Sequence, residues 1–185
     1  MLGIRSVVAI VLAALSLSWN LATGQMRQVP EYHLKAVFLH RFASFVDWPS
    51  TSPSDSTFTI GILGSDPFGE ALDVIETQRV GGLPIEVKRF SRLDELENTH
   101  ILFVSSSANH LLGRILVAVG DHATLTVGEA ANFASNGGII RFITRDRQIR
   151  LEVNRCAAER AGLHISALLL QMAELTPGAC GVPGP

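Results

Sequence analysis

Alternating apolar residues indicate where the strands of this chain lie. Phe58, Ile60 and Ile62 occupy every second position of STFTIGILG, the period at which the side chains of a strand share one face. Further runs rich in β-branched residues cover residues 83–90, 100–104, 123–127, 138–144 and 148–153. The last two runs are separated only by Arg145-Asp146-Arg147, a connection so short that it predicts an antiparallel hairpin.

Helical segments alternate with these strands. Residues 67–76 and 109–119 are the candidates, which gives the order β-α-β-β-α-β before the hairpin. Crossover helices of this kind favour parallel strands in a sheet that is covered on both faces. The sequence therefore predicts a single α/β domain with a central mixed sheet, mostly parallel with a C-terminal antiparallel hairpin, flanked by helices on both faces.

The segment EYHLKAVFLHRFASFVDWP, residues 31–49, predicts the first helix. Pro30 suits the start of a helix, and Pro49 ends it because the residue before a proline is pushed out of the α region. At 100° per residue, one apolar arc contains Leu34, Val37, Phe38, Phe45 and Trp48, with Phe42 at its edge. We expect this arc to face the sheet.

Arg41 interrupts the apolar arc between Val37 and Phe45. An unpaired guanidinium is costly to bury. Its stem could lie along apolar surface while its head reaches water, it could pair with an acid or with carbonyl groups, or it could mark a surface that binds a partner. These alternatives stay open, and Arg41 is our candidate residue for a partner interface.

After the hairpin, capping residues predict further helix. Asn154 and Ser166 are suited to N-cap two segments, and Gly162 to end the first of them. The second segment would extend to about residue 175, and three of its side chains would point toward the core: Leu168, Leu169 and Met172. Whether this region is one bent helix or two short ones stays open. TPGACGVPGP, residues 176–185, contains too much proline and glycine for a regular element and predicts a flexible tail.

The first residues have the pattern of an export signal. Arg5 supplies a positive charge, residues 7–17 are apolar except for Ser16, and residues 22–24 give the small-x-small pattern that signal peptidase accepts. The apolar run is shorter than the ~20 residues that span a bilayer. We expect a signal peptide at 1–24 that is cleaved before Gln25, an α/β domain at 25–175, a tail at 176–185, and a periplasmic location.

Composition narrows the classes of function. The chain has 185 residues, of which 47% are hydrophobic and 17% charged, as in one packed domain. The net charge is −2 and the pI is near 6.3, so the chain has no basic excess with which to neutralise phosphates. We therefore expect no nucleic-acid partner.

The spacing of polar residues gives no catalytic, cofactor or metal motif. GILGSDPFG, residues 61–69, lacks both the G-x-G-x-x-G spacing and a lysine, and Asp66 would repel a phosphate, so it is better interpreted as at or near a helix N-cap. His33 and His40 are seven residues apart, too far along a helix for one metal. The serines at 105–107 lack a nucleophile elbow and are expected to cap a helix. We expect neither an enzyme nor a cofactor.

An open α/β sheet does offer a crevice at the carboxyl ends of its strands. In this chain, the residues at that edge would be Gly64, Ser65, Ser105, Ser106 and Ser107. A periplasmic small-ligand-binding module is therefore the alternative function.

Six blocks in series resemble the YfiR family of exported bacterial proteins, over residues 31–175. These blocks are EYHLKAVFLHRFASFVDWP, FTIGILGSDPFGEAL, RVGGLPIEVKRF, HILFVSSS, LTVGEAANFASNGGIIRF and IRLEVNRCAAERAGLHIS. The resemblance implies a periplasmic α/β regulator that binds the sensor domain of a YfiN-like membrane diguanylate cyclase and lowers cyclic di-GMP. It also implies a YfiB-like outer-membrane lipoprotein that competes for the regulator, and an ability to form a homodimer.

The cysteines depart from this family. Its best-known member resembles a protein held by two intramolecular disulfides, whereas this chain has only Cys156 and Cys180. The periplasm permits a bridge, but one straight helix over residues 156–174 would hold the two Cα atoms near the longest separation that a disulfide allows. A break at Gly162 would relax this. A bridge, or a buried Cys156 with a free tail thiol, are the two alternatives.

Overall fold

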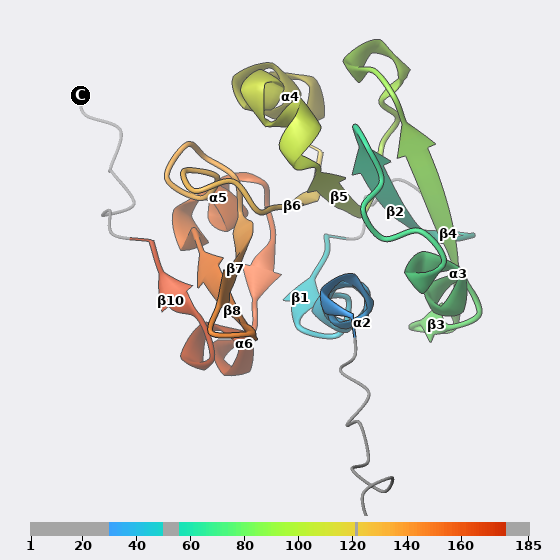
Figure 1. Cartoon of the computed structure of the whole chain (residues 1–185), viewed down its shortest axis with the longest axis horizontal. Coiled ribbons are helices and arrows are strands. Elements are labelled where there is room, and N and C mark those ends of the chain that lie inside the picture. Colours follow the sequence, from blue (N-terminus) through green and yellow to red (C-terminus); the bar gives the residue numbers. More distant parts are fainter. Residues whose placement is uncertain (1–29, 50–55, 121, 177–185) are drawn as a thin grey trace, which may run out of the picture.

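One large sheet organises the described part of the chain (Figure 1). The computed structural model describes residues 30–49, 56–120 and 122–176. The strand order is β10-β8-β7-β6-β5-β2-β4-β3, and neighbours run parallel except in the pairs β3–β4 and β7–β8. This confirms the predicted mixed α/β sheet. The predicted signal peptide at 1–24 and tail residues 177–185 lie outside the described residues.

The strands and helices have the following bounds. The strands are β1 (Val46–Asp47), β2 (Phe58–Leu63), β3 (Arg79–Val80), β4 (Leu83–Phe90), β5 (Ile101–Val104), β6 (Leu125–Gly128), β7 (Ile140–Arg145), β8 (Gln148–Val153), β9 (His164–Ile165) and β10 (Glu174–Leu175). The helices are α2 (Glu31–Phe42), α3 (Ala71–Glu76), α4 (Leu112–Val119), α5 (Arg155–Arg160) and α6 (Ala167–Gln171), with short 3₁₀ turns η2 (Leu93–Glu95) and η3 (Ser106–Leu111).

Side chains alternate along the central strands between two apolar cores. Ile101 and Phe103 of β5 belong to the larger core, to which α2 and α3 contribute. Leu102 and Val104 of the same strand belong to the smaller core, which α4 covers. Figure 1 shows α4 on one side of β5 and β2, and α2 and α3 on the other side. The prediction of helices on both faces is therefore confirmed. Such helices are needed because a strand that is buried on both sides must be covered on each side.

The order in which successive strands are added to the sheet reverses between β2 and β5. These strands are parallel neighbours, but β2 is followed by α3 on one face and β5 by η3 and α4 on the other. The carboxyl ends of β2 and β5 therefore form the topological switch point, where open α/β sheets bind ligands.

The predicted antiparallel hairpin joins β7 to β8. Its loop has two residues, because Arg145 is already paired with Gln148. Asp146 and Arg147 have φ angles of 51° and 62°, the left-handed values that a type I′ turn requires. Aspartate tolerates this conformation but arginine disfavours it, so the strand pairing imposes the turn on Arg147.

Helix α2 ends earlier than the sequence predicts. It stops at Phe42, and Val46–Asp47 pairs as β1 with β9 in a small antiparallel sheet. The amide of Ser166 also donates to the Phe45 carbonyl at 2.8 Å. The prediction of a helix as far as Pro49 is wrong, because this pairing satisfies backbone groups that the helix would otherwise have used.

The buried face of α2 also differs from the prediction. It consists of Lys35, Ala36, Leu39 and Phe42, whereas Leu34 and Val37 are 41% and 45% exposed. Phe38, Phe45 and Trp48 are partly buried and pack against the core. The helix has apolar residues on several sides, so its pattern alone does not fix the inward direction. The ring of Phe142 on β7 fixes it, because Phe42 stacks on that ring at 5.8 Å.

The caps that were predicted after the hairpin are confirmed. The Asn154 side chain accepts a hydrogen bond from the Ala157 amide at 2.9 Å, and Ser166 Oγ accepts one from Leu169 at 3.3 Å. Gly162 has a φ of 70°, as a glycine that ends a helix should. The region forms two short helices, α5 and α6, separated by β9.

The inward face predicted for α6 is only partly correct. Leu169 is buried, but Leu168 and Met172 are 55% and 58% exposed. The helix ends at Gln171 because Glu174–Leu175 pairs with β8 as β10. Thr176, the first residue of the predicted tail, continues this pairing by donating its amide to the Val153 carbonyl at 3.0 Å.

Candidate functional site

The switch-point crevice is the cavity at the carboxyl ends of β2 and β5, and its volume is about 380 Å³. The Ser65 amide donates to Ser107 Oγ at 2.9 Å, and the Ser105 amide donates to the Leu63 carbonyl at 3.0 Å. The structure therefore brings together the residues that the sequence placed at this edge. Gly64, Ser65 and Ser107 line the cavity, along with Ser91, Arg92 and His110.

Gly64 allows the close approach of the two loops. Its φ is +94°, and a Cβ atom at this position would lie 2.5 Å from Ser107 Oγ. A side chain would therefore strain the backbone and displace Ser107. The glycine makes the crevice narrow and well defined at this point.

The serines of the crevice have different roles. Ser105 is buried, and its Oγ accepts from the Ser107 amide at 3.4 Å, so it caps η3 as expected. Ser106 is exposed and does not line the cavity. At the rim, Arg92 is already paired with Asp94 and Glu95. The crevice thus offers hydroxyl groups to a small polar molecule, and ligand binding there stays a prediction.

Asp66 stabilises the loop after β2 rather than a helix end. Its Oδ1 accepts from the Phe68 amide at 2.7 Å, and its Oδ2 accepts from Arg89 Nε at 2.8 Å. Helix α3 begins only at Ala71, so the expectation of a helix N-cap at Asp66 is wrong. The carboxylate closes a short turn instead, which is a common use of aspartate.

Lys35, the most deeply buried cation in the part of the chain that the structure describes, was missed by the sequence analysis. It is only 3% exposed, and its Nζ bonds to the carboxylates of Glu31 and Glu129. The Tyr32 hydroxyl donates to Glu129 Oε2 at 3.1 Å, and the Tyr32 ring centroid lies 4.7 Å from Nζ. Thr144 Oγ1 donates to Glu31 Oε1 at 2.7 Å. These residues, which we call the Lys35 cluster, attach α2 to the ends of β6 and β7.

The cluster favours the charged forms of Lys35 and Glu31. Burial lowers the pKa of Lys35, but hydrogen bonds with Glu129 and Glu31 outweigh it, so the net pKa is raised. Burial and the charge of Glu129 raise the pKa of Tyr32. Hydrogen bonds from Lys35 and then Thr144 lower the pKa of Glu31. One signal was available in the sequence, since Glu31 precedes Lys35 by one helical turn.

The outer face of α2, defined as Leu34, Val37 and Arg41, points to solvent. Arg41 is exposed, and its guanidinium forms no ion pair with any residue that the structure describes. Among the alternatives for Arg41, pairing with an acid is therefore not observed within these residues. The two apolar neighbours leave a mixed apolar and cationic surface along one side of the helix.

Histidines and acids do not converge in the described ranges. No group of three His, Cys, Asp or Glu residues there could hold a metal ion. His33 is exposed, and His40 Nε2 lies 3.5 Å from the Arg79 carbonyl oxygen. His100 is buried, burial lowers its pKa, and its Nδ1 accepts from the Thr59 amide at 3.1 Å. These contacts are structural.

Cys156 at the start of α5 is disulfide-bonded. The straight helix over residues 156–174 that would oppose a bridge to Cys180 does not form, because β9 separates α5 from α6. Cys180 itself lies outside the described residues, so its pairing stays a prediction. None of the helices in the described ranges is both long and apolar enough to cross a membrane.

Two solved structures resemble this fold at low sequence identity. A conserved domain protein from Vibrio cholerae gives a TM-score of 0.51 at 14% identity, over 80% of this chain and 60% of that one. The ABC domain in complex with L-Trp from Streptococcus pneumonia gives 0.47 at 12% identity, over 64% and 55%. This chain thus spans less than two thirds of either protein, and the likeness to the Vibrio cholerae protein concerns the fold alone.

The sequence comparisons are more specific. No curated protein matches the chain. A family model described as YfiR/HmsC-like matches residues 32–174, which includes the described helices except for Glu31, the first residue of α2, and nearly all of the sheet. On the strength of this match, the chain belongs to the YfiR/HmsC-like family.

Proposed function

We propose that this protein is a periplasmic regulator of cyclic di-GMP signalling that holds an inner-membrane diguanylate cyclase inactive by binding its periplasmic sensor domain. The observation that carries the proposal is the family match over residues 32–174. The export-signal pattern at residues 1–24 supports the same compartment. A YfiB-like outer-membrane lipoprotein would act in the opposite direction by competing for the regulator.

The outer face of α2 is the proposed contact for the sensor domain. Leu34 and Val37 are large apolar side chains with about two fifths of their surface in water. Arg41 adds a positive charge beside them, and arginine is favoured in interfaces because its planar guanidinium pairs with carboxylates in two places. The complementary surface would carry apolar side chains around an aspartate or glutamate.

Inhibition by binding requires a difference in affinity. The regulator must bind the inactive conformation of the sensor more tightly than the active one, since equal affinity would shift nothing. Contacts along one helix face can supply this difference if the sensor presents the matching carboxylate in only one of its conformations.

Deletion of the gene tests the regulatory role. We expect cyclic di-GMP in the native host to rise, and to return to its original level when the gene is supplied again. Mass spectrometry of nucleotide extracts measures the change. An unchanged level in the deletion strain would count against the proposal.

The Arg41→Met variant tests the docking surface. It should fold normally but capture about tenfold less of the cyclase from envelope extracts, because a charge-assisted pair is lost. Arg114→Met is the matched control, since Arg114 is an exposed arginine on α4, which covers the other face of the sheet. Equal capture by all three proteins would remove the outer face of α2 from the interface.

The switch-point crevice favours a second candidate function, a small-ligand-binding module. A thermal-shift screen with polar metabolites would detect a ligand. Ser107→Ala should weaken the response because Ser107 lines the cavity, whereas Ser106→Ala should not, because Ser106 does not. A hit that is insensitive to Ser107→Ala binds elsewhere.

A further inference from the structure

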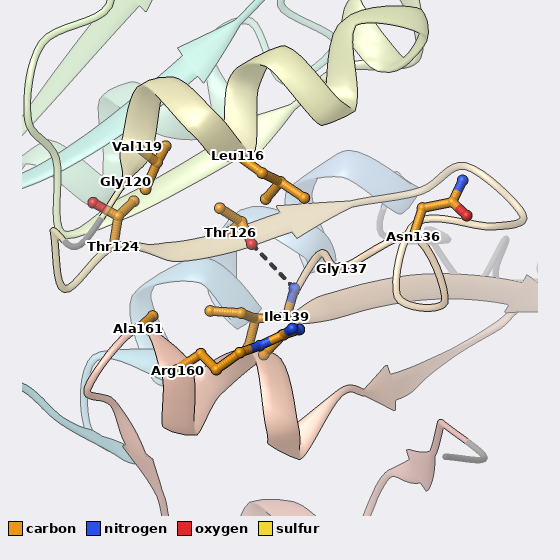
Figure 2. A pocket seen from close by; sticks show the side chains of 11 residues that line it. Leu116, Val119, Gly120, Thr124, Thr126, Asn136, Gly137, Ile139, Arg160 and Ala161 are labelled. Atoms are coloured by element: carbon orange, nitrogen blue, oxygen red, sulfur yellow. Dashed lines mark hydrogen bonds between the residues drawn. The ribbon is translucent and has the colours of Figure 1, made fainter. Parts of the chain in front are cut away.

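A second cavity lies between α4 and α5, away from both surfaces discussed above (Figure 2). We call it the α4–α5 groove, and its volume is about 340 Å³. Leu116 and Val119 of α4 form one side, Ala157 and Ala161 the other, and Ile139 lies in the loop before β7. This volume falls at the lower end of the range for cavities that hold small molecules.

Hydrogen bonds hold the walls of the groove in place. The Ile139 amide donates to Thr126 Oγ1 at 3.0 Å, as the dashed line in Figure 2 shows. Gly137 has a φ of +102°, and a Cβ atom there would lie 3.0 Å from a methyl carbon of Leu116. The loop can therefore approach α4 only with glycine at this position. The groove is shaped before any ligand arrives, which reduces the entropy cost of binding.

The described lining of the groove contains one charged side chain. Arg160 is the one charged residue among the described residues that line the groove. Its neighbour Arg155 pairs with Glu159 at 2.8 Å, whereas Arg160 forms no ion pair with the residues that the structure describes. In Figure 2 the Arg160 side chain runs from α5 past Ile139. An available guanidinium thus lies beside an apolar surface.

We propose that the α4–α5 groove binds a small amphiphilic monoanion, an apolar chain or ring that carries one carboxylate. The apolar walls bury the hydrocarbon part, and Arg160 pairs with the carboxylate. A polyphosphate would need further cations that the groove lacks. The site is independent of the proposed regulatory function, because it requires no partner protein.

Titration of the purified chain with butyrate, hexanoate and octanoate tests the proposal. Affinity should rise about fourfold for each added methylene group, as expected for burial of a hydrocarbon chain. Octanamide has the same chain without the charge and should bind about tenfold more weakly than octanoate. Isothermal titration calorimetry measures all four ligands. No binding of octanoate, or an affinity independent of chain length, would overturn the proposal.

Two variants locate the binding. Arg160→Gln should weaken octanoate binding about tenfold and leave octanamide binding unchanged, since only the carboxylate uses the guanidinium. Arg155→Gln, on the same helix, should bind octanoate as the unmodified chain does. Ala161→Phe should abolish binding of both ligands by filling the groove. If octanoate binds Arg160→Gln or Ala161→Phe as tightly as the unmodified chain, the ligand does not occupy this groove.

Discussion

Helix α2 has a buried face that contains a lysine and an exposed face that contains a leucine and a valine. Lys35 is 3% exposed, while Leu34, the residue before it, is 41% exposed. Hydrophobicity alone would predict the reverse. The difference shows that burial in this helix follows from the partners that the rest of the fold provides.

The partners differ on the two faces. On the buried face, Phe142 packs against Phe42, and Glu129 bonds to the Lys35 ammonium. A buried charge is tolerated when it is paired and hydrogen-bonded, and Lys35 has two carboxylates. On the outer face, no described element covers Leu34 or Val37 enough to bury them. This exposed surface is the one that we propose for binding the sensor domain.

Among the variants that test this difference between the two faces, Leu39→Ala should lower the stability most. Leu39 is fully buried, so its truncation should lower the free energy of unfolding by about 2–5 kcal/mol. Leu34→Ala makes the same chemical change on the exposed face of the same helix and should cost at most about 0.5 kcal/mol. Urea unfolding of both variants measures the difference. Equal losses would mean that α2 is oriented differently in solution.

Lys35→Met should have an intermediate effect. The change leaves the Glu129 carboxylate without its cation and should cost about 1–3 kcal/mol. The double variant Lys35→Met/Glu129→Gln should recover part of this loss, because no buried charge then remains unpaired. Equilibrium unfolding of both variants measures the coupling. A double variant less stable than Lys35→Met would contradict the assignment of the pair.

Tyr32→Phe should have a smaller effect than Lys35→Met, about 0.5–1.5 kcal/mol, through loss of the hydrogen bond to Glu129. The fold raises the pKa of Tyr32 and the pKa of Lys35. The protonated forms of both groups therefore stabilise the fold. This stabilisation is complete below about pH 10 and falls as the pH rises above that value. Thermal unfolding from pH 8 to 11 measures this fall. The fall should be shallower in Tyr32→Phe, and an unchanged slope would show that the Tyr32 hydroxyl does not contribute.

Much of the candidate site was accessible from the sequence. Gly64, Ser65 and the serines at 105–107 follow strands that read clearly as parallel, so their meeting at one edge of the sheet follows from topology. The exposure of Arg41 agrees with two of its three open alternatives, a head that reaches water and a surface that binds a partner. The Lys35 cluster could not be predicted, because Glu129 lies 94 residues from Lys35 and their contact depends on how α2 rotates over β6. The α4–α5 groove likewise depends on the packing of distant helices.

The sequence by itself determined the six strands β2, β4, β5, β6, β7 and β8, their mostly parallel arrangement, the hairpin, and the caps at Asn154 and Ser166. These features depend on interactions between residues close in the chain, or on the runs of apolar and β-branched residues that strands covered on both faces show. The tertiary structure alone decided where α2 ends, which of its sides is buried, and that Leu168 and Met172 stay exposed. A helix with apolar residues on several sides could bury any of these sides. Contact with a specific ring, carboxylate or strand edge elsewhere in the fold decides which side is buried.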